Sequence, residues 1–142
     1  MITIREAAQS DLTQLTQLTI QLGYPTSTEQ ISRRLHGILT SQNDIILVAE
    51  HHNKLRGWIT AQATYRLSAD PFVEIGGLVV DENIRGQGVG KKLIQAVADW
   101  AKQNEILNLR VRCNVIRLDT HQFYQHLGFT EAKTQKVFKK TI

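Results

Sequence analysis

Residues 73–100 constrain the fold most, because they join a strand pattern, a glycine-rich turn and a helix pattern without interruption. The apolar run at residues 75–80 is followed by a short polar loop. Three alternating glycines, Gly86, Gly88 and Gly90, come next, and an amphipathic helix pattern begins at once. Glycine allows a tight turn, and the free N–H groups at a helix start attract anions together with the helix dipole. This stretch therefore predicts a site for a phosphorylated ligand.

Three phosphate-binding patterns can be compared with this loop. The P-loop pattern fails because Lys92 stands where Ser or Thr is required and Arg85 where the first glycine is required. The Rossmann pattern fails because the third glycine comes one residue early and no acid ends the next strand. The pattern R-x-x-G-x-G is matched in full, by Arg85, Gly88 and Gly90. The alternative interpretation is a tight strand–helix connection with Arg85 as a surface charge.

A second motif follows downstream, where an asparagine, an F-Y pair and an L-G-F triplet occur in order: Asn114, Phe123, Tyr124, Leu127, Gly128 and Phe129. With the R-x-x-G-x-G loop, it resembles the GNAT superfamily of N-acetyltransferases, whose loop holds the pyrophosphate of acetyl-CoA. The residues before the F-Y pair depart from the family, which usually has small side chains where this chain has Asp119, Thr120, His121 and Gln122.

Length and composition describe an ordinary globular protein. The chain has 142 residues, with 42% hydrophobic and 21% charged residues, so we expect one domain spanning residues 1–142. No apolar run approaches the roughly 20 residues of a membrane span, and the N-terminus has no signal-peptide pattern. The single cysteine, Cys113, allows no internal disulfide, so we expect a cytoplasmic protein. Its apolar strand register favours a core residue over a nucleophile.

The charge balance bears on the partners. The net charge is +4 and the isoelectric point is near 9.4, which suits an anionic cofactor. Nucleic-acid binding would also suit a basic chain, but the sequence has neither a basic stripe with interleaved aromatics nor zinc-ligand spacing. We therefore expect acetyl-CoA and an amine acceptor as partners, with no nucleic acid, membrane or metal. A homodimer remains open.

Hydrophobic periodicity predicts the elements of the first half. Strands are expected at residues 2–5, 44–50, 55–65, with a bulge near Gly57, and 72–80. Asp11 is expected to cap a helix that buries Leu12, Leu15, Leu18 and Leu22. Ser27 or Thr28 is expected to start a second helix that buries Ile31, Leu35, Ile38 and Leu39.

The second half predicts two helices and two strands. A helix at residues 88–103 should bury Val89, Leu93, Val97 and Trp100. A strand at residues 106–113 should turn Leu107, Leu109, Val111 and Cys113 to one side. A short helix at residues 119–127, ended by Gly128, should precede a strand within residues 129–142.

The resulting order is β-αα-βββ-α-β-α-β, and the strands on either side of the longer helix should be parallel. This is the GNAT order. The resemblance implies a mixed α/β fold, with a twisted mixed sheet of six to seven strands flanked by about four helices.

The resemblance also implies how acetyl-CoA is held. The loop would bind the pyrophosphate through Arg85, Gly86, Gln87, Gly88, Val89, Gly90 and Lys91. The strand edge formed by Leu78, Val79 and Val80 would pair with the pantetheine arm, and the Val80 N–H would contact the thioester carbonyl. Asn114 would bond the pantetheine from the opposing strand, near Tyr124.

Amine acetylation requires two proton transfers. An alkylamine has a pKa near about 10.4 and must lose a proton, whereas the leaving thiolate, with a thiol pKa of about 8.5, gains one. Tyr124 is the candidate donor, and its alternative role is packing beside Phe123. Glu74 is the candidate base, because alternation places Glu74, Gly76, Leu78 and Val80 on one face. Its alternatives are a carboxylate paired with an arginine, or proton removal by water.

The acceptor is the least defined part of the sequence. Tyr24, Pro25, Trp58, Tyr65 and Asp70 lie in segments that would border the amine in such a fold. No acidic cluster indicates an aminoglycoside pocket, and no motif indicates a groove for a protein N-terminus. The leading hypothesis is an N-acetyltransferase that moves an acetyl group from acetyl-CoA to a primary amine of a small molecule, by direct attack in a ternary complex. The alternatives are a protein N-terminal or lysine acetyltransferase, and a non-catalytic CoA-binding module.

Overall fold

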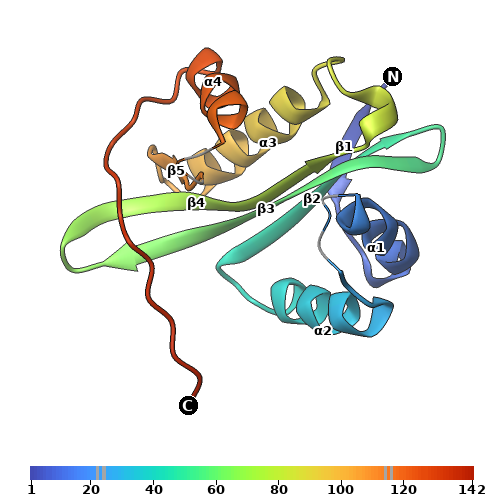
Figure 1. Cartoon of the computed structure of the whole chain (residues 1–142), viewed down its shortest axis with the longest axis horizontal. Helices are drawn as coiled ribbons and strands as arrows, with labels where there is room; N and C mark the ends of the chain where they lie inside the picture. The colour runs from blue at the N-terminus through green and yellow to red at the C-terminus, as the bar shows by residue number, and fades with distance from the viewer. Residues whose placement is uncertain (22, 24, 114, 116) are drawn as a thin grey trace. The chain divides into compact units, whose positions relative to one another are not determined.

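The computed structural model of the chain describes residues 1–142 apart from positions 22, 24, 114 and 116. These residues form two compact units, 1–111 and 112–142, and each is considered by itself. The first unit contains a five-stranded sheet in the order β1-β2-β3-β4-β5 (Figure 1). Its strands are β1 (Thr3–Glu6), β2 (Asp44–His51), β3 (Lys54–Arg66), β4 (Ala69–Val80) and β5 (Leu109–Val111).

Helices cover both faces of this sheet. The helices α1 (Leu12–Ile20) and α2 (Thr28–Leu39) lie on one side, and α3 (Val89–Gln103) lies on the other (Figure 1). We call these sides the α1/α2 face and the α3 face. All neighbouring strands are antiparallel except β4 and β5, which are parallel because α3 carries the chain across between them. The mixed sheet and the parallel pair are as predicted.

Local sequence signals account for the helices. Ser27 caps α2, since its Oγ accepts the Gln30 N–H at 3.1 Å while Gln30 Oε1 accepts the Ser27 N–H at 3.0 Å. Of the predicted inner residues of α3, Val89, Leu93 and Val97 are buried, and Trp100 is half-buried. Two predictions are wrong. Leu39 is 42% exposed at the end of α2, and Asp11 does not cap α1 because its carboxylate accepts from Arg5 and the Ala8 N–H.

Two bulges change which residues share a face of the sheet. In β3, Gly57 pairs with Ala49 and Leu55 with Glu50, so Arg56 is the extra residue. In β4, Gly77 pairs with Thr60 and Ile75 with Ala61, so Gly76 is the extra residue. A bulge reverses the alternation of side chains beyond it, because one added residue shifts the period of two.

Glycines allow close packing next to these bulges. A Cβ on Gly57 would lie 2.7 Å from the Val79 carbonyl oxygen, so only glycine fits where β3 approaches β4. A Cβ on Gly77 would lie 3.0 Å from the ring of Trp58. Trp58 is half-buried and packs against the core of the α1/α2 face, which includes Leu15, Leu18, Leu35, Ile46, Val48, Leu55 and Val79.

The strand predicted at residues 106–113 is shorter than expected. β5 spans only Leu109–Val111, and Leu107, predicted to face inward, is 82% exposed. The buried residue is Ile106, whose N–H donates to the Ala101 carbonyl at 2.9 Å while Glu105 adopts a φ of 61°. This is a Schellman cap on α3, so the apolar pattern before β5 belongs partly to the end of the helix.

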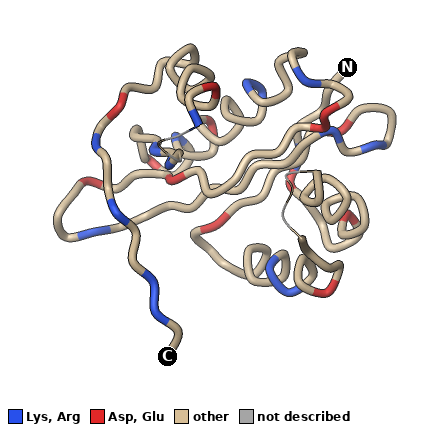
Figure 2. Tube along the Cα trace, in the orientation of Figure 1, with Lys and Arg blue, Asp and Glu red and all other residues tan. Residues whose placement is uncertain are grey.

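The second unit contains α4 (Leu118–His126), followed by Gly128 with a φ of 92°. The strand predicted within residues 129–142 is wrong, because the described residues there form no helix or strand and almost all are exposed. Figure 2 shows basic residues recurring along this segment, all of them lysines, and its large apolar residues Val137 and Phe138 are adjacent rather than alternating. Such a pattern offers no apolar face to a sheet. The described residues thus give five strands rather than the six to seven expected.

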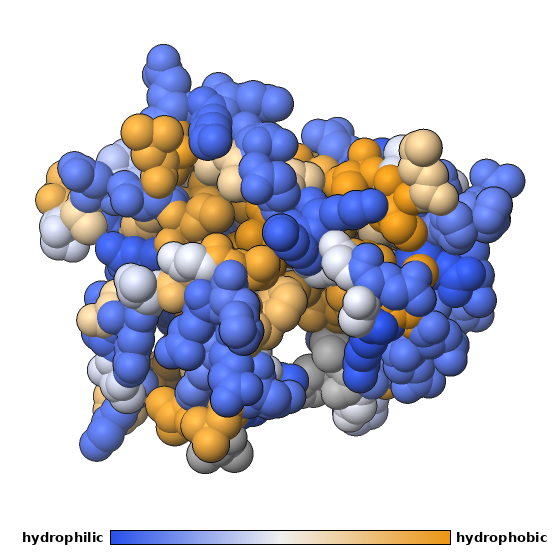
Figure 3. Space-filling model, turned by 90° about the horizontal axis from the view of Figure 1, so that it is seen from above, coloured by the Kyte–Doolittle hydropathy of each residue, from blue (hydrophilic) through white to orange (hydrophobic). Residues whose placement is uncertain are grey.

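Exposed apolar side chains interrupt the polar surface on the face shown in Figure 3. Among all the described residues, the most exposed large apolar side chains come from turns and chain ends, and include Met1, Leu67, Leu107, Phe138 and Ile142. Single exposed apolar residues are ordinary on a protein surface. No helix in the described part of the chain is long and apolar enough to cross a membrane.

Candidate active site

The edge of β4 that pairs with β5 is unpaired towards the C-terminal end of β4. β5 pairs with β4 only from Val73 to Ile75, and the bulge at Gly76 comes directly after. Within the described residues, β4 beyond this point has β3 on one side and no strand on the other. An open strand edge offers backbone N–H and C=O groups to an extended ligand. Leu78, Val79 and Val80, the predicted pantetheine edge, all lie in this stretch.

The bulge corrects the predicted face of Glu74. Glu74 pairs with Gln62 and lies on the α1/α2 face, whereas Leu78 pairs with Ile59 and lies on the α3 face together with Val80. The prediction that Glu74 shares a face with Leu78 and Val80 is therefore wrong, because the extra residue Gly76 reverses the alternation of side chains between them. Glu74 instead shares its face with Gly77 and Val79.

Arginines lie near Glu74 on the α1/α2 face. The register places Arg110 of β5 directly beside Glu74. The Arg110 guanidinium lies 3.9 Å from the centre of the buried Phe72 ring, and the Arg66 guanidinium lies 5.2 Å from the same ring. The arrangement keeps both interpretations of Glu74 open, as a base and as a partner for an arginine.

The glycine-rich loop has the conformation that its sequence predicts. After the short 3₁₀ turn η2 (Glu82–Ile84), Gly86 and Gly88 adopt φ values of 84° and 79°. A Cβ on either glycine would meet no atom within 4 Å, so the space beside the backbone is open. Helix α3 begins at Val89, and the first of its N–H groups to bond within the helix is that of Lys92, to the Gly88 carbonyl at 3.0 Å.

The N–H groups before Lys92 therefore have no acceptor within the helix, and they form the positive end of the helix dipole. The predicted loop residues divide by burial. Val89 and Gly90 are buried at the start of α3, whereas the others are exposed: Arg85, Gly86, Gln87, Gly88 and Lys91. Arg85 folds back along the loop, since its Nε donates to the Val80 carbonyl at 3.4 Å. A loop with open backbone and exposed cations suits a pyrophosphate.

A buried carboxylate beneath this loop was not predicted. Asp81 is 2% exposed, and its Oδ1 accepts the Asn83 N–H at 3.1 Å while its Oδ2 pairs with Arg56 Nη1 at 3.2 Å. The hydrogen bond from the Asn83 N–H holds the pKa of Asp81 below its usual value, and Arg56 and Gln21 lower it further. The sequence signal was the D-x-N spacing after a strand, which is typical of an Asx turn.

Tyr124 belongs to the second unit, on α4. It is 8% exposed, and its ring makes edge-to-face contacts with Phe123 and Phe129, at centroid distances of 5.1 and 5.5 Å. Burial raises the pKa of Tyr124 to about 12, so the phenol is neutral and carries its proton at physiological pH. Burial also raises the pKa of the Cys113 thiol, which agrees with the prediction that it is not a nucleophile.

Several other predicted residues do not define a site. Asn114 and Tyr24 lie outside the described residues. Pro25, Tyr65 and Asp70 are exposed, and Trp58 packs into the core with its indole N–H buried and unpartnered among the described residues. The described residues contain no group of three or more His, Cys, Asp or Glu that could hold a metal ion.

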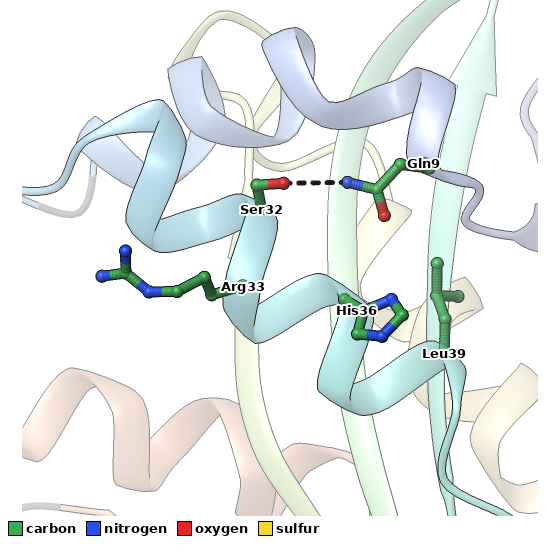
Figure 4. A pocket seen from close by; sticks show the side chains of 5 residues that line it. All are labelled: Gln9, Ser32, Arg33, His36 and Leu39. Carbon is green, nitrogen blue, oxygen red and sulfur yellow. Dashed lines mark hydrogen bonds between the residues drawn. The ribbon is translucent and has the colours of Figure 1, made fainter.

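A surface hollow lies away from the loop. It has a volume of about 640 Å³ and lies between the turn η1 (Gln9–Asp11) and α2. Figure 4 shows Gln9 Nε2 donating to Ser32 Oγ, at 3.1 Å, above Arg33, His36 and Leu39. None of these side chains belongs to β4, η2 or the start of α3, so the hollow is separate from the candidate cofactor site.

Comparison with known proteins agrees with this geometry. A profile of the Acetyltransferase (GNAT) family matches residues 10–129. Aminoglycoside N(6')-acetyltransferase type 1 of Serratia marcescens is 29% identical in an alignment of 110 residues that covers 68% of this chain and 75% of that protein. N-acetylaspartate synthetase of Xenopus tropicalis is 29% identical over 82 residues, which are 58% of this chain and 29% of that protein.

Solved structures show the same fold. The structure of AAC(6')-Iy in complex with the bisubstrate analog CoA-S-monomethyl-acetylneamine has a TM-score of 0.88 at 22% identity, covering 100% of this chain and 99% of that one. A transcriptional regulator from Bacillus halodurans also has a TM-score of 0.88 at 22% identity, covering 99% and 100% of the two chains. The chain belongs to the GNAT acetyltransferase family and is an acetyl-CoA-dependent N-acetyltransferase.

Proposed function

We propose that this enzyme transfers the acetyl group of acetyl-CoA to a primary amine of a small molecule, by direct attack in a ternary complex. The observation that carries the proposal is the continuity of the open β4 edge at residues 76–80 with the glycine loop that follows it. An extended thioester arm pairs with the edge, and the pyrophosphate at its other end binds the loop. The names of the two curated relatives, which describe acetylation of an aminoglycoside and of aspartate, favour a small acceptor.

The proposed steps balance in protons and charge. The neutral amine nitrogen attacks the thioester carbonyl carbon, and the Val80 N–H stabilises the oxyanion that forms. The C–S bond then breaks, and Tyr124 donates its proton to the departing sulfur. The surplus proton of the amine leaves to Glu74 or to water, and a proton returned through the solvent restores the Tyr124 hydroxyl. Glu74 is the candidate base, and its side chain lies on the α1/α2 face, opposite the face that carries the Leu78 and Val80 side chains.

The fold alone does not determine the acceptor, since an aminoglycoside acetyltransferase and a transcriptional regulator match it equally well. We therefore propose an assay of thiol release from acetyl-CoA against a panel of aminoglycosides, polyamines, amino acids and short peptides. Mass spectrometry would identify each acetylated product. We expect release that depends on a small amine and yields one acetylated amine per thiol, and acetyl-CoA without amine is the control.

Two results would contradict the proposal. Acetylation restricted to peptides would support a protein acetyltransferase. Binding of acetyl-CoA, detected as a rise in melting temperature, without thiol release from any amine would support a non-catalytic CoA-binding module.

A further inference from the structure

Asp81 is buried where the two halves of the candidate cofactor site meet. It follows Val80, the last residue of β4, and precedes the turn η2, which leads to the glycine loop. Its backbone is fixed on both sides, since its N–H donates to the Arg56 carbonyl at 2.7 Å and its carbonyl accepts the Ile84 N–H at 3.0 Å. Burial of a carboxylate is unfavourable unless it is paired and hydrogen-bonded, so its position requires a specific reason.

The contacts of this carboxylate join three separate elements. Oδ1 accepts from the Asn83 N–H and, at 3.3 Å, from Asn83 Nδ2, which holds the turn η2. Oδ2 accepts from Arg56, the extra residue of the β3 bulge. Gln21, at the end of α1, accepts the Glu82 N–H at 3.0 Å, and its side chain also lowers the pKa of Asp81. The turn before the loop is thus fixed to β3 and to α1.

The glycine loop requires such support. Gly86 and Gly88 have no side chains to anchor them, and glycine loses more conformational entropy on ordering than any other residue. A loop that is held at one end by α3 and at the other by the Asp81 contacts is ordered before the ligand arrives. Such pre-organisation lowers the entropy cost of binding.

Arg56 indicates that stability alone does not explain the pair. Its Nε is buried and, among the described residues, has no hydrogen-bond partner. Replacing a buried ion pair with apolar residues is often neutral or stabilising. An incompletely satisfied pair at this place therefore favours a positional role.

We propose that Asp81 is a positioning residue that holds the phosphate loop in the conformation that binds the pyrophosphate of acetyl-CoA. It acts through the turn η2 and touches neither cofactor nor acceptor. The inference rests on the proposed placement of the pyrophosphate on residues 85–91. It also assigns Gln21 and Arg56 as the groups that fix Asp81 to the rest of the first unit.

The test compares two conservative variants, Asp81→Asn and Asp11→Asn. Both remove the charge of a buried aspartate that is paired with an arginine, but Asp11 lies between β1 and α1. Isothermal titration would give the Kd of acetyl-CoA, and competition would give that of S-acetylpantetheine, which lacks the pyrophosphate. We expect Asp81→Asn to weaken acetyl-CoA at least about tenfold, because small misplacements of binding groups cost this much or more. S-acetylpantetheine should change less than about twofold, since it makes no pyrophosphate contacts.

Asp11→Asn should lower the melting temperature without changing either Kd. Equal weakening of both ligands by Asp81→Asn, or no weakening at all, would overturn the proposal. Gly88→Asp in the same titration tests the loop assignment separately from the role of Asp81. If Gly88→Asp leaves acetyl-CoA binding intact, the assignment of the loop as the pyrophosphate site fails. If Gly88→Asp loses binding and Asp81→Asn does not, only the role of Asp81 is rejected. Should Asp81→Asn fail to fold, Gln21→Ala should still weaken acetyl-CoA selectively, by about threefold, and an unchanged Kd would reject the proposal.

Discussion

Asp11 and Asp81 are two buried aspartates with similar partners in different parts of the first unit. They are 6% and 2% exposed, each pairs with an arginine, and each accepts a backbone N–H in a short 3₁₀ segment. Their geometry differs. Arg5 approaches Asp11 with both terminal nitrogens at 2.9 Å and also pairs with Glu50, whereas Arg56 offers Asp81 one contact at 3.2 Å.

The comparison shows that a buried aspartate paired with an arginine can serve two purposes. The fork between Arg5 and Asp11 is the stronger geometry, and with Glu50 it ties β1 to β2 and to the start of α1. Asp81 fills its remaining hydrogen-bonding capacity with the backbone and side chain of its own turn. We interpret Asp11 as a residue that stabilises the fold and Asp81 as one that shapes the cofactor loop.

The largest expected effect is on stability. Asp11→Ala leaves Arg5 with Glu50 alone and the Ala8 N–H without its acceptor, and the loss of this part-buried pair together with that hydrogen bond costs about 3 kcal/mol. The melting temperature should fall by about 10 °C. Urea unfolding would measure the change, and the acetyl-CoA Kd of the folded variant should equal that of the parent. A Kd that rises with the loss of stability would remove the distinction between the two aspartates.

Tyr124→Phe should affect turnover alone. It removes one hydroxyl and little volume, so we expect kcat to fall about 10- to 100-fold, the lower range for a positioned acid, with acetyl-CoA affinity nearly unchanged. Steady-state kinetics with the best acceptor would measure both parameters. Equal kcat values for the variant and the parent would assign Tyr124 to packing with Phe123 and Phe129, and place it with Asp11 as a structural residue.

Glu74→Gln should have a smaller effect on the rate. If Glu74 is the base, the variant should lower kcat/KM about tenfold or less at neutral pH and displace the acidic limb of its pH profile. Glutamine keeps the shape and loses the proton acceptor, so packing is nearly unchanged. If Glu74→Gln keeps full activity and its kcat/KM profile keeps the acidic limb at the same pH, Glu74 is a partner of the nearby arginines.

The smallest expected effect is on stability in acid. Both aspartates have a pKa below the ordinary value of 3.8, Asp11 because of Arg5 and Asp81 because of the Asn83 N–H. A lowered folded-state pKa gives stability that is present above pH 3.8 and is lost as the pH falls through the folded-state value. Melting temperatures from pH 6 to pH 2 should therefore decline less steeply in Asp11→Asn and Asp81→Asn than in the parent. If the melting temperatures of the variants and the parent fall in parallel, neither carboxylate contributes to the loss of stability in acid.

The sequence predicted the elements whose signals are local. The start of α2 at Ser27, the buried stripe of α3 and the glycine turn before it all depend on residues close together in the chain. The candidate phosphate loop was found for the same reason, since its spacing is contained in a hexamer.

Features that depend on tertiary pairing were missed. The bulge at Gly76 reversed the face of Glu74, and its only local signal was the pair Gly76 and Gly77. In the sequence, Asp81 is indistinguishable from an ordinary polar loop residue, because Gln21 and Arg56 approach it from distant parts of the chain. Ile106 was assigned to a strand because a helix cap and a strand use the same apolar residue.

The most direct measurement is the titration of acetyl-CoA into the parent, Gly88→Asp and Gly23→Asp. Both glycines have positive φ and open space beside them, and aspartate tolerates this conformation better than most residues. An aspartate at Gly88 places a negative charge where the pyrophosphate would bind, so we expect affinity to fall at least about 100-fold. Gly23→Asp should bind as the parent does. Affinity of Gly88→Asp within about twofold of the parent would contradict the assignment of residues 85–91 as the pyrophosphate site.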